Sequence, residues 1–452
     1  MKLLFTETNV VQKICGRQEY IQNTPYRKSI HCFQIPCNEG VLLYHTMTGA
    51  LILIQDGEEF EEHLETLVGH WFFVPEEFDE VKYTEDVRKI VRMVNVAPQG
   101  KRHFTVLTTT DCNARCFYCY EMGIPRYHMT DETARDVADY ITETSGGENV
   151  KLSWFGGEPL YNYRAIEIIC DRLKSNGIKY SSIMTSNGYY LGAEIAAKAK
   201  LDWNVQEIQI TLDGTERTYN RTKAYIDADR NPFHRVLNNI ESVLEKGIKV
   251  IIRLNVDADN ANDIYQLIDD LLLRFPCCDK LSFNVVLLKQ LSGRIHHFES
   301  EEQASAIRRR LIQKLDIHGL VRYDEMSRNI SINQCMADND SCEVILPDGR
   351  IEKCEHYNEA EIIGSIYDNE RDMEIVNAWK ERIVFEECKK CVLYPRCYAL
   401  RKCDWRQNGC GKTVQDFLGD MLRGQILKKY NEIKQGGVTS ETEEQLYTDG
   451  TW

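Results

Sequence analysis

The 452-residue sequence lacks an apolar run long enough to cross a membrane, since no stretch approaches the roughly 18 apolar residues that a span requires. We expect no signal peptide, because the first residues, Met-Lys-Leu-Leu-Phe-Thr-Glu-Thr, become polar and acidic too early for one. Basic residues are in deficit: 55 Lys and Arg face 70 Asp and Glu, a net charge of −15. We therefore expect a cytoplasmic protein with no membrane partner, and the charge argues against nucleic acid.

Cysteine, by contrast, is abundant, and 17 cysteines are too many for disulfides in a reducing cytoplasm. Three lie between Cys112 and Cys119 and eight between Cys335 and Cys410. Clustered thiols in such a compartment predict metal binding. The remaining six are interpreted as small buried apolar side chains: Cys15, Cys32, Cys37, Cys170, Cys277 and Cys278.

The first cysteine group is Cys112, Cys116 and Cys119, a Cys-x3-Cys-x2-Cys triplet directly after a β-rich run. This position puts three thiols on one loop at the carboxyl end of a strand. Three thiolates can hold three irons of a 4Fe–4S cluster and leave the fourth iron open. The alternatives are structural zinc, which usually has a fourth protein ligand, and thiols that only fill the core.

The triplet, with Tyr118 just before its third cysteine, resembles the signature of the radical S-adenosylmethionine (SAM) enzymes. The resemblance implies that the open iron binds SAM through its amine and carboxylate, and it places Tyr118 at the cofactor. It further implies that one electron, from a flavodoxin or ferredoxin, cleaves SAM to methionine and a 5′-deoxyadenosyl radical.

Strand-like and helix-like patterns alternate between about residues 99 and 325, which is typical of a parallel sheet with crossover helices. The resemblance implies an α/β fold, a partial (β/α)6 TIM-like barrel, and ligands of such folds gather at the carboxyl ends of the strands. The predicted strands are Phe104–Thr110, Val150–Phe155, Ser181–Thr185, Gln206–Leu212, Val250–Asp257 and Leu281–Leu288. The predicted helices are Thr130–Thr144, Tyr163–Ser175, Gly192–Lys200, Pro232–Lys246 and Asn262–Phe275.

Candidate cofactor residues follow these strands in order. Gly156, Gly157 and Glu158 come after the second strand, where glycines permit close approach and a carboxylate can accept from an ammonium. The family's Gly-Gly-Glu motif grips the SAM amino group, so the resemblance gives Glu158 that role. Each candidate alone is also compatible with a plain turn, but their order downstream of the triplet favours a cofactor site. The others are Thr185, Ser186 and Asn187, then Asp213, then Arg253 with Asn255 on one face of the fifth strand.

The segment before the barrel, residues 1–98, is predicted to hold three short strands followed by helices. It resembles the winged-helix-like recognition module in front of many radical SAM enzymes that modify ribosomally made peptides. A leader peptide would add a strand to an open sheet edge. The alternative is a structural cap on the barrel. The predicted strands are Ile30–Ile35, Gly40–His45 and Thr48–Ile54, with helices at 56–67 and 84–94.

The cysteine-rich region, residues 326–415, resembles the SPASM extension of radical SAM enzymes, which holds two auxiliary 4Fe–4S clusters. A hairpin is expected from Val344 to Cys354, and a C-terminal helix and polar tail follow at 416–452. The family has a cysteine where Arg401 stands, so Cys403 either follows a two-residue insertion or is not a ligand. Zinc ribbons are the alternative. The ligand sets implied are Cys335, Cys342, Cys354 and Cys403 for one cluster, and Cys388, Cys391, Cys397 and Cys410 for the other.

The resemblance as a whole implies an anaerobic enzyme with SAM and three 4Fe–4S clusters. Its partner would be a precursor peptide with a leader, modified by an oxidative thioether or carbon–carbon cross-link. Glu355 follows Cys354 where sulfatase-maturating relatives have a catalytic Asp, so it is the candidate base, with His356 as substitute. The alternatives are a sulfatase-maturating, formylglycine-generating enzyme and, in another class, a non-catalytic iron–sulfur or zinc protein.

Overall fold

A computed structural model of the chain divides it into two compact units. The larger comprises Ala97–Arg322 and Cys335–Glu381, and the smaller comprises Met1–Val96, Tyr323–Gln334 and Arg382–Trp452. Across the part of the chain that the structure describes, no helix is both long and apolar enough to span a bilayer. The structure describes residues 1–6, 10–94, 101–226, 231–276, 279–288, 298–321, 335–356, 358–381, 384–397, 402, 410 and 412–435.

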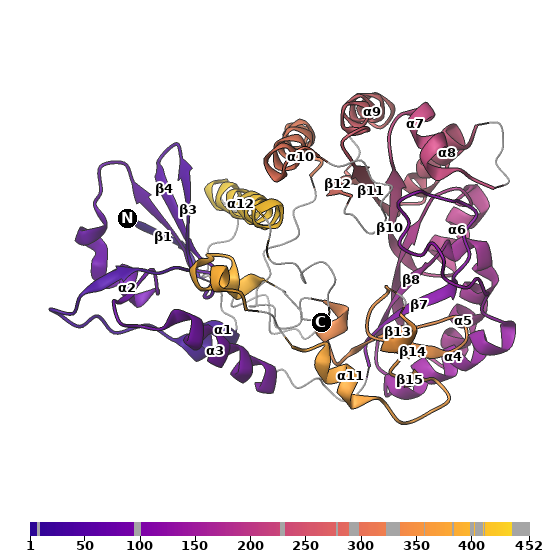
Figure 1. Cartoon of the computed structure of the whole chain (residues 1–452), viewed down its shortest axis with the longest axis horizontal. Helices are drawn as coiled ribbons and strands as arrows, with labels where there is room; N and C mark the ends of the chain where they lie inside the picture. Colours follow the sequence, from indigo (N-terminus) through magenta and orange to yellow (C-terminus); the bar gives the residue numbers. More distant parts are fainter. Residues whose placement is uncertain are drawn as a thin grey trace. The chain divides into compact units, whose positions relative to one another are not determined.

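The larger unit is built on a sheet in which six strands lie in sequence order, each parallel to the next (Figure 1). Their bounds are β7 (His103–Thr109), β8 (Val150–Gly156), β9 (Tyr180–Ser186), β10 (Val205–Leu212), β11 (Lys249–Val256) and β12 (Leu281–Leu287). The sheet is open, with β12 at one edge. The predicted α/β fold with a partial barrel is thus confirmed.

Helices connect these strands where the sequence predicts them. Thr130 caps the first by accepting from the backbone N–H of Thr133 at 3.1 Å, and Asn231 caps the fourth by accepting from the N–H of His234 at 3.2 Å. The bounds are α4 (Asp131–Thr144), α5 (Tyr163–Ser175), α6 (Ala193–Leu201), α8 (Pro232–Glu245) and α9 (Ala261–Arg274), with η2 (Pro159–Asn162) before α5. Among the described helices of the barrel region, α7 (Glu216–Lys223) and α10 (Glu301–Asp316) were not predicted.

One face of the parallel sheet carries the core against these helices. Trp154 of β8, Ile210 of β10 and Leu254 of β11 are fully buried there, and each such side chain contributes roughly 1.5–3 kcal/mol. Alternate strand positions, among them Thr211 and Arg253, are only partly buried. The opposite face of the sheet is therefore rich in polar groups.

The predicted hairpin is confirmed, and it continues the barrel sheet. β13 (Cys342–Ile345) pairs in parallel with β7, and β14 (Arg350–Glu352) pairs antiparallel with β13. Gly349 closes the turn with a φ of +85°, which favours glycine. The pairing of β13 with β7 was not predicted from the sequence. The rest of this segment comprises η3 (Met336–Asp338), η4 (Glu359–Glu361), β15 (Gly364–Ser365) and α11 (Met373–Ala378).

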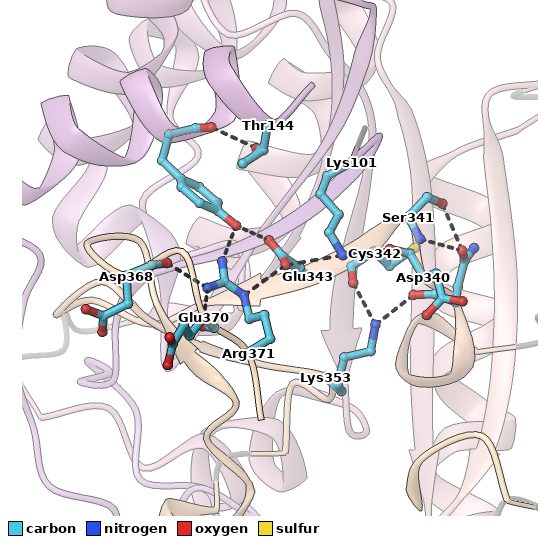
Figure 2. A network of polar contacts seen from close by, with 12 residues as sticks. Lys101, Thr144, Asp340, Ser341, Cys342, Glu343, Lys353, Asp368, Glu370 and Arg371 are labelled. Atoms are coloured by element: carbon cyan, nitrogen blue, oxygen red, sulfur yellow. Dashed lines mark hydrogen bonds and ion pairs between the residues drawn. The ribbon is translucent and has the colours of Figure 1, made fainter. Parts of the chain in front are cut away.

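A buried carboxylate fixes β13 to the barrel. Glu343 is 1% exposed and accepts a hydrogen bond from the Tyr140 hydroxyl of α4 at 2.6 Å. Lys101 Nζ and Arg371 Nε lie 3.3 Å and 3.4 Å from its Oε1 (Figure 2). Nearby, Lys353 donates to the carbonyls of Asn339 and Cys342, and burial lowers its pKa to about 8 (Figure 2). Since an unpaired buried charge is costly, these contacts specify where the hairpin docks.

The smaller unit contains a four-stranded antiparallel sheet in the order β1-β5-β4-β3. The strands β3 (Cys32–Cys37), β4 (Gly40–His45) and β5 (Leu51–Gln55) confirm the predicted meander, whereas β1 (Lys2–Phe5) was not predicted. The helix predicted over 56–67 begins later, as η1 (Phe60–His63) and α2 (Leu64–Gly69). The other elements are α1 (Val10–Cys15), the pair β2 (Tyr26–Lys28) and β6 (Phe73–Pro75), α3 (Glu80–Val94), η5 (Glu386–Lys390), η6 (Tyr394–Arg396) and α12 (Lys412–Lys434).

The two faces of this sheet are covered by different parts of the chain. Leu43 and Ile52 pack with Leu67 of α2 and Phe72. On the other face, Leu42 and Leu53 share a cluster with residues of α12 (Figure 1). The N-terminal and C-terminal segments therefore build one core.

Candidate functional site

The cysteine triplet leaves the carboxyl end of β7 as a turned loop. The N–H of Ala114 donates to Cys112 Sγ at 3.3 Å, and the N–H of Cys119 donates to the carbonyl of Cys116 at 3.1 Å. Burial, together with nearby charges that include the other thiols, raises the pKa of Cys112 and Cys119 to about 12. The three thiols are thus close enough to affect one another's ionisation.

The triplet loop carries three neighbouring thiols with a polar side chain beside one of them. Among the residues described, no three Cys, His, Asp or Glu side chains form a group that could hold a single metal ion. Three thiolates can bind three irons of a four-iron cluster and leave the fourth iron open. Asn187 Nδ2 lies 3.7 Å from Cys112 Sγ, and such donors commonly support a ligating sulfur.

Gly156 and Gly157 have a role that the sequence did not predict. A Cβ on Gly156 would lie 2.1 Å from the carbonyl oxygen of Thr109, and one on Gly157 would lie 2.3 Å from that of Asp111. The N–H groups of Gly157 and Glu158 donate to these same two carbonyls at 3.1 Å and 3.0 Å. We expected the glycines to admit a ligand; in the structure they let the end of β8 pack against the start of the cysteine loop.

Glu158 joins the ends of β8 and β9. Its fully buried carboxylate accepts from the Asn187 N–H at 2.7 Å, the Ser186 hydroxyl at 2.9 Å and the Leu160 N–H at 3.1 Å. Burial raises its pKa to about 7, although these hydrogen bonds oppose the shift. A carboxylate has about four acceptor sites, so one remains for another donor. The structure therefore brings together three predicted residues, Glu158, Ser186 and Asn187.

A buried ion pair lies under the same loop. The Tyr118 hydroxyl donates to Asp213 Oδ1 at 2.8 Å, and Lys223 Nζ lies 3.1 Å from Asp213 Oδ2, with Lys223 3% exposed and Asp213 fully buried. Burial works against the Lys223 charge, but Asp213 leads the groups that raise its pKa well above its ordinary value. The Lys223 carbonyl also accepts from the Arg115 N–H at 2.8 Å. Sequence reasoning missed Lys223, since a lysine in a short polar helix normally indicates a solvated surface.

The remaining predicted cofactor residues lie on the polar face of the sheet. Arg253 Nε donates to Asn255 Oδ1 at 2.9 Å, which confirms that the two share a face. Arg253 is paired in register with Thr211 on β10 and Asn284 on β12. Thr185 is half-buried near the carboxyl end of β9. Thr211 and Asn284, which the sequence reasoning missed, extend the same polar row.

The candidate base Glu355 lies beside the triplet loop. The ring of His356 stacks on that of Tyr120, which directly follows Cys119, with centroids 4.1 Å apart and an interplanar angle of 11°. The pKa of Tyr120 is raised well above its usual value by burial and then by Glu121, Glu355, Cys119 and Cys354. The segment 354–356 therefore packs against the cysteine loop of the barrel.

Glu121 is a further carboxyl at this place that the sequence reasoning did not select. It is half-buried, and burial raises its pKa to about 7. A carboxyl that titrates near neutrality beside a stacked aromatic pair can exchange protons at physiological pH. A Glu just after a cysteine motif gives no signal of this in sequence.

The cysteines of the two predicted auxiliary sets differ in their surroundings. Cys388, Cys391, Cys397 and Cys410, the second set, lie in the smaller unit. Burial comes first among the causes that raise the pKa of Cys388 and Cys391, and the nearby Cys397 and Cys410 add to it. In the predicted first set, Cys335, Cys342 and Cys354 lie in the larger unit. Cys403 and Arg401 are outside the described residues, so the insertion between them stays a prediction.

The structure describes four of the six scattered cysteines. Cys15, Cys32 and Cys170 are buried, as predicted, and Cys37 is half-buried. Cys277 and Cys278 lie outside the described residues.

This geometry defines a class: an open parallel α/β barrel with a cysteine loop at the carboxyl end of its first strand and a polar ring around it. Residues 106–271 match the model of the radical SAM superfamily. The chain therefore carries a radical SAM domain.

Known proteins with similar sequence or structure cover different shares of the chain. An uncharacterized protein of Methanocaldococcus jannaschii is 33% identical over 122 residues, which span 26% of this chain and 40% of that relative. The structure of native anSMEcpe with bound AdoMet is similar over 74% of this chain and 99% of that one, with a TM-score of 0.57 and 16% identity. Streptococcus suis SuiB bound to precursor peptide SuiA is similar over 86% and 98%, with a TM-score of 0.50 and 12% identity. These structural similarities show the fold.

Proposed function

We propose that the protein is a radical SAM/SPASM enzyme that modifies a ribosomally made precursor peptide. The observation that carries the proposal is the buried Glu158 junction, which fixes the Gly-Gly-Glu turn, Ser186 and Asn187 against the cysteine loop. A structural metal protein has no need for a buried carboxylate with spare acceptor capacity at that point. The solved complexes of similar folds with AdoMet and with a precursor peptide support the same proposal.

In the proposed site, Cys112, Cys116 and Cys119 hold the first cluster. With SAM bound, that cluster supplies one-electron cleavage of SAM and hence a hydrogen-abstracting radical. Glu158 accepts from the SAM ammonium. Arg253 and Asn255 face the carboxylate and ribose, together with Thr185, and the Asp213–Lys223 pair holds Tyr118 and the loop in place.

Glu355 is proposed as the base. Forming a bond from a thiol, or oxidising a carbon radical, releases a proton, and a carboxylate close to both cysteine segments can accept it. The packing of His356 on Tyr120 keeps Glu355 next to the cysteine loop of the barrel. His356 itself is the alternative acceptor.

The remaining assignments of the chain are part of the same proposal. Residues 1–98 form a peptide-recognition module, 99–325 the barrel, 326–415 the SPASM region with two auxiliary clusters, and 416–452 the C-terminal helix and tail. β3 is an edge strand of the N-terminal sheet, where a leader peptide can add a strand. A flavodoxin or ferredoxin supplies electrons, and the product is a thioether or carbon–carbon cross-link. A sulfatase-maturating reaction is the alternative, and this N-terminal sheet favours the peptide maturase.

The test compares two variants of the reconstituted protein. Replacing Cys112, Cys116 and Cys119 with Ala should leave roughly two thirds of the iron, because two of three clusters remain, and abolish 5′-deoxyadenosine formation. Undiminished 5′-deoxyadenosine would contradict the assignment.

Glu355→Gln should keep all the iron and cleave SAM but accumulate little modified peptide. Wild-type product yield from pH 6 to 9 would remove Glu355 from the mechanism.

A further inference from the structure

The loop that carries Cys388, Cys391 and Cys397 is a chain of tight turns in the smaller unit. The N–H groups of Cys391, Tyr394 and Cys397 each donate to a carbonyl three residues earlier, at 3.1, 3.0 and 3.3 Å. Such turns have poorer hydrogen-bond geometry than an α-helix and rarely persist alone. The positions of the three thiols therefore depend on what supports the loop from outside.

Helix α3 of the N-terminal segment supplies that support through Arg88, which is 5% exposed. Its Nη2 donates to the carbonyls of Tyr394 and Pro395, the latter at 2.8 Å. Its Nη1 pairs with Glu85 at 2.6 Å, and the Tyr394 hydroxyl donates to the same Glu85 oxygen at 2.6 Å. The guanidinium also lies 4.8 Å from the centre of the Tyr394 ring. Arg88, Glu85 and Tyr394 thus hold one another in a closed set of charge-assisted contacts.

A second support comes from the N-terminal sheet. The hydroxyl of Thr46, between β4 and β5, donates to the carbonyl of Val392 at 2.6 Å. Leu393 is 7% exposed and packs in the cluster that Leu42 of β4 and Ile426 of α12 share. The segment between Cys391 and Cys397 therefore contacts the N-terminal sheet through Val392 and Leu393, and it contacts α3 through Tyr394 and Pro395.

We propose that Arg88 is a positioning residue for the second auxiliary cysteine set, so that α3 shapes the site of a cluster. The two carbonyls that Arg88 binds lie between Cys391 and Cys397, and their hydrogen bonds set the path of the loop from one thiol to the next. A lysine at position 88 would restore the charge but not the forked donors that reach two carbonyls and Glu85 together. The identity of the bound group rests on the proposed function, whereas the loop geometry does not.

The first experiment measures the apoprotein. Arg88→Ala should speed alkylation of Cys391 and Cys397 by about tenfold, because a loop without its charged donors opens more often. Arg88→Lys should restore part of the protection. Lys89→Ala is the matched control on the same helix, since the Lys89 side chain is 70% exposed and pairs with Asp86. Cys170, fully buried in the larger unit, is the internal reference. Equal alkylation rates in wild type and Arg88→Ala would overturn the proposal.

The second experiment measures the reconstituted protein. Arg88→Ala should either retain roughly two thirds of the wild-type iron or show an altered electron paramagnetic resonance signal and midpoint potential of one auxiliary cluster, with SAM cleavage preserved. Unchanged iron, signal and potential would count against the positioning role. If Arg88→Ala does not fold, Tyr394→Phe decides the matter, because it removes only the hydroxyl bound to Glu85. It should raise alkylation by about threefold, and no rise would reject the proposal.

The two proposals fail in different ways. If the wild type binds no iron but alkylation rises as expected, Arg88 still positions the loop and the proposed function fails. If the wild type binds three clusters and alkylation does not change, the function stands and the role of Arg88 is lost.

Discussion

The two cysteine loops of this protein are supported in different ways. The triplet loop of the larger unit is held by the next strands of its own barrel: Gly157 binds Thr109, and Asn187 binds Asn113. The Cys388–Cys397 loop of the smaller unit is held by side chains more than 300 positions away, Arg88 at 306 from Tyr394 and Thr46 at 346 from Val392. Repeated βα units thus create a site from segments that are near in sequence, whereas the second site needs the N-terminal and C-terminal segments to pack together.

The largest effect is expected from breaking the buried pair beneath the triplet. Lys223→Met leaves the Asp213 carboxylate, 0% exposed, without its cation, and the free energy of unfolding should fall by roughly 3–5 kcal/mol. The double variant Asp213→Asn/Lys223→Met should recover most of this loss. Chemical denaturation of the apoprotein measures both. Lys198→Met, whose ion pair with Glu167 is about a third exposed on each side, should cost under about 1 kcal/mol. If Lys223→Met also lowered the free energy of unfolding by less than about 1 kcal/mol, the buried pair would not stabilise the larger unit as expected.

Acid should change the stability of the two units in opposite directions. Burial lowers the pKa of His31 in the smaller unit to about 4, so the unfolded state binds more protons between pH 6.5 and about 4, and stability is lost as the pH falls through that window. Burial raises the pKa of Glu158 in the larger unit to about 7, so stability there falls as the pH rises from 4.5 to about 7. The His31 contribution can reach roughly 3 kcal/mol.

Hydrogen exchange at pH 7.5 and pH 5 measures this difference. The protection of backbone amides against exchange should decrease in β3 to β5 at pH 5, whereas it should stay the same or increase in β8 and β9. His31→Gln should flatten the dependence in the smaller unit. Equal pH slopes for the two units, or a slope that His31→Gln leaves unchanged, would show that these buried groups do not set their stability.

The smallest effect is expected from a pair of glycine substitutions. Gly157→Ala places a Cβ 2.3 Å from the carbonyl oxygen of Asp111 and should cost roughly 1–3 kcal/mol, because neither backbone can move freely. Gly419→Ala in α12 meets nothing within 4 Å and should stabilise the smaller unit by about 0.5–1 kcal/mol. Thermal unfolding of the two apoproteins gives the signs. Two destabilising substitutions would mean that α12 is more tightly packed than the structure shows.

The strands and most connecting helices of the barrel could be predicted from the sequence alone. Alternating apolar patterns predicted β7 to β12 and α4 to α6, α8 and α9 because parallel βα units repeat a local signal. The order of motifs along the chain placed Glu158, Ser186 and Asn187 at one end of the sheet, since the carboxyl ends of parallel strands share an edge. The assignment of eight cysteines to two sets followed from the resemblance alone, and the structure gathers the second set within one unit.

The contacts between segments that are distant in sequence could not be predicted and are visible in the three-dimensional structure alone. Nothing local in Arg88, Lys223 or Glu343 distinguishes a buried charge from a solvated one, because charged residues in helices and strands are mostly exposed. The pairing of β13 with β7 and the packing of α12 on the N-terminal sheet depend on surfaces that exist only after both elements have formed. Such contacts have no period or motif in the sequence, since their energy comes from burial and charge pairing between residues that are far apart in the chain.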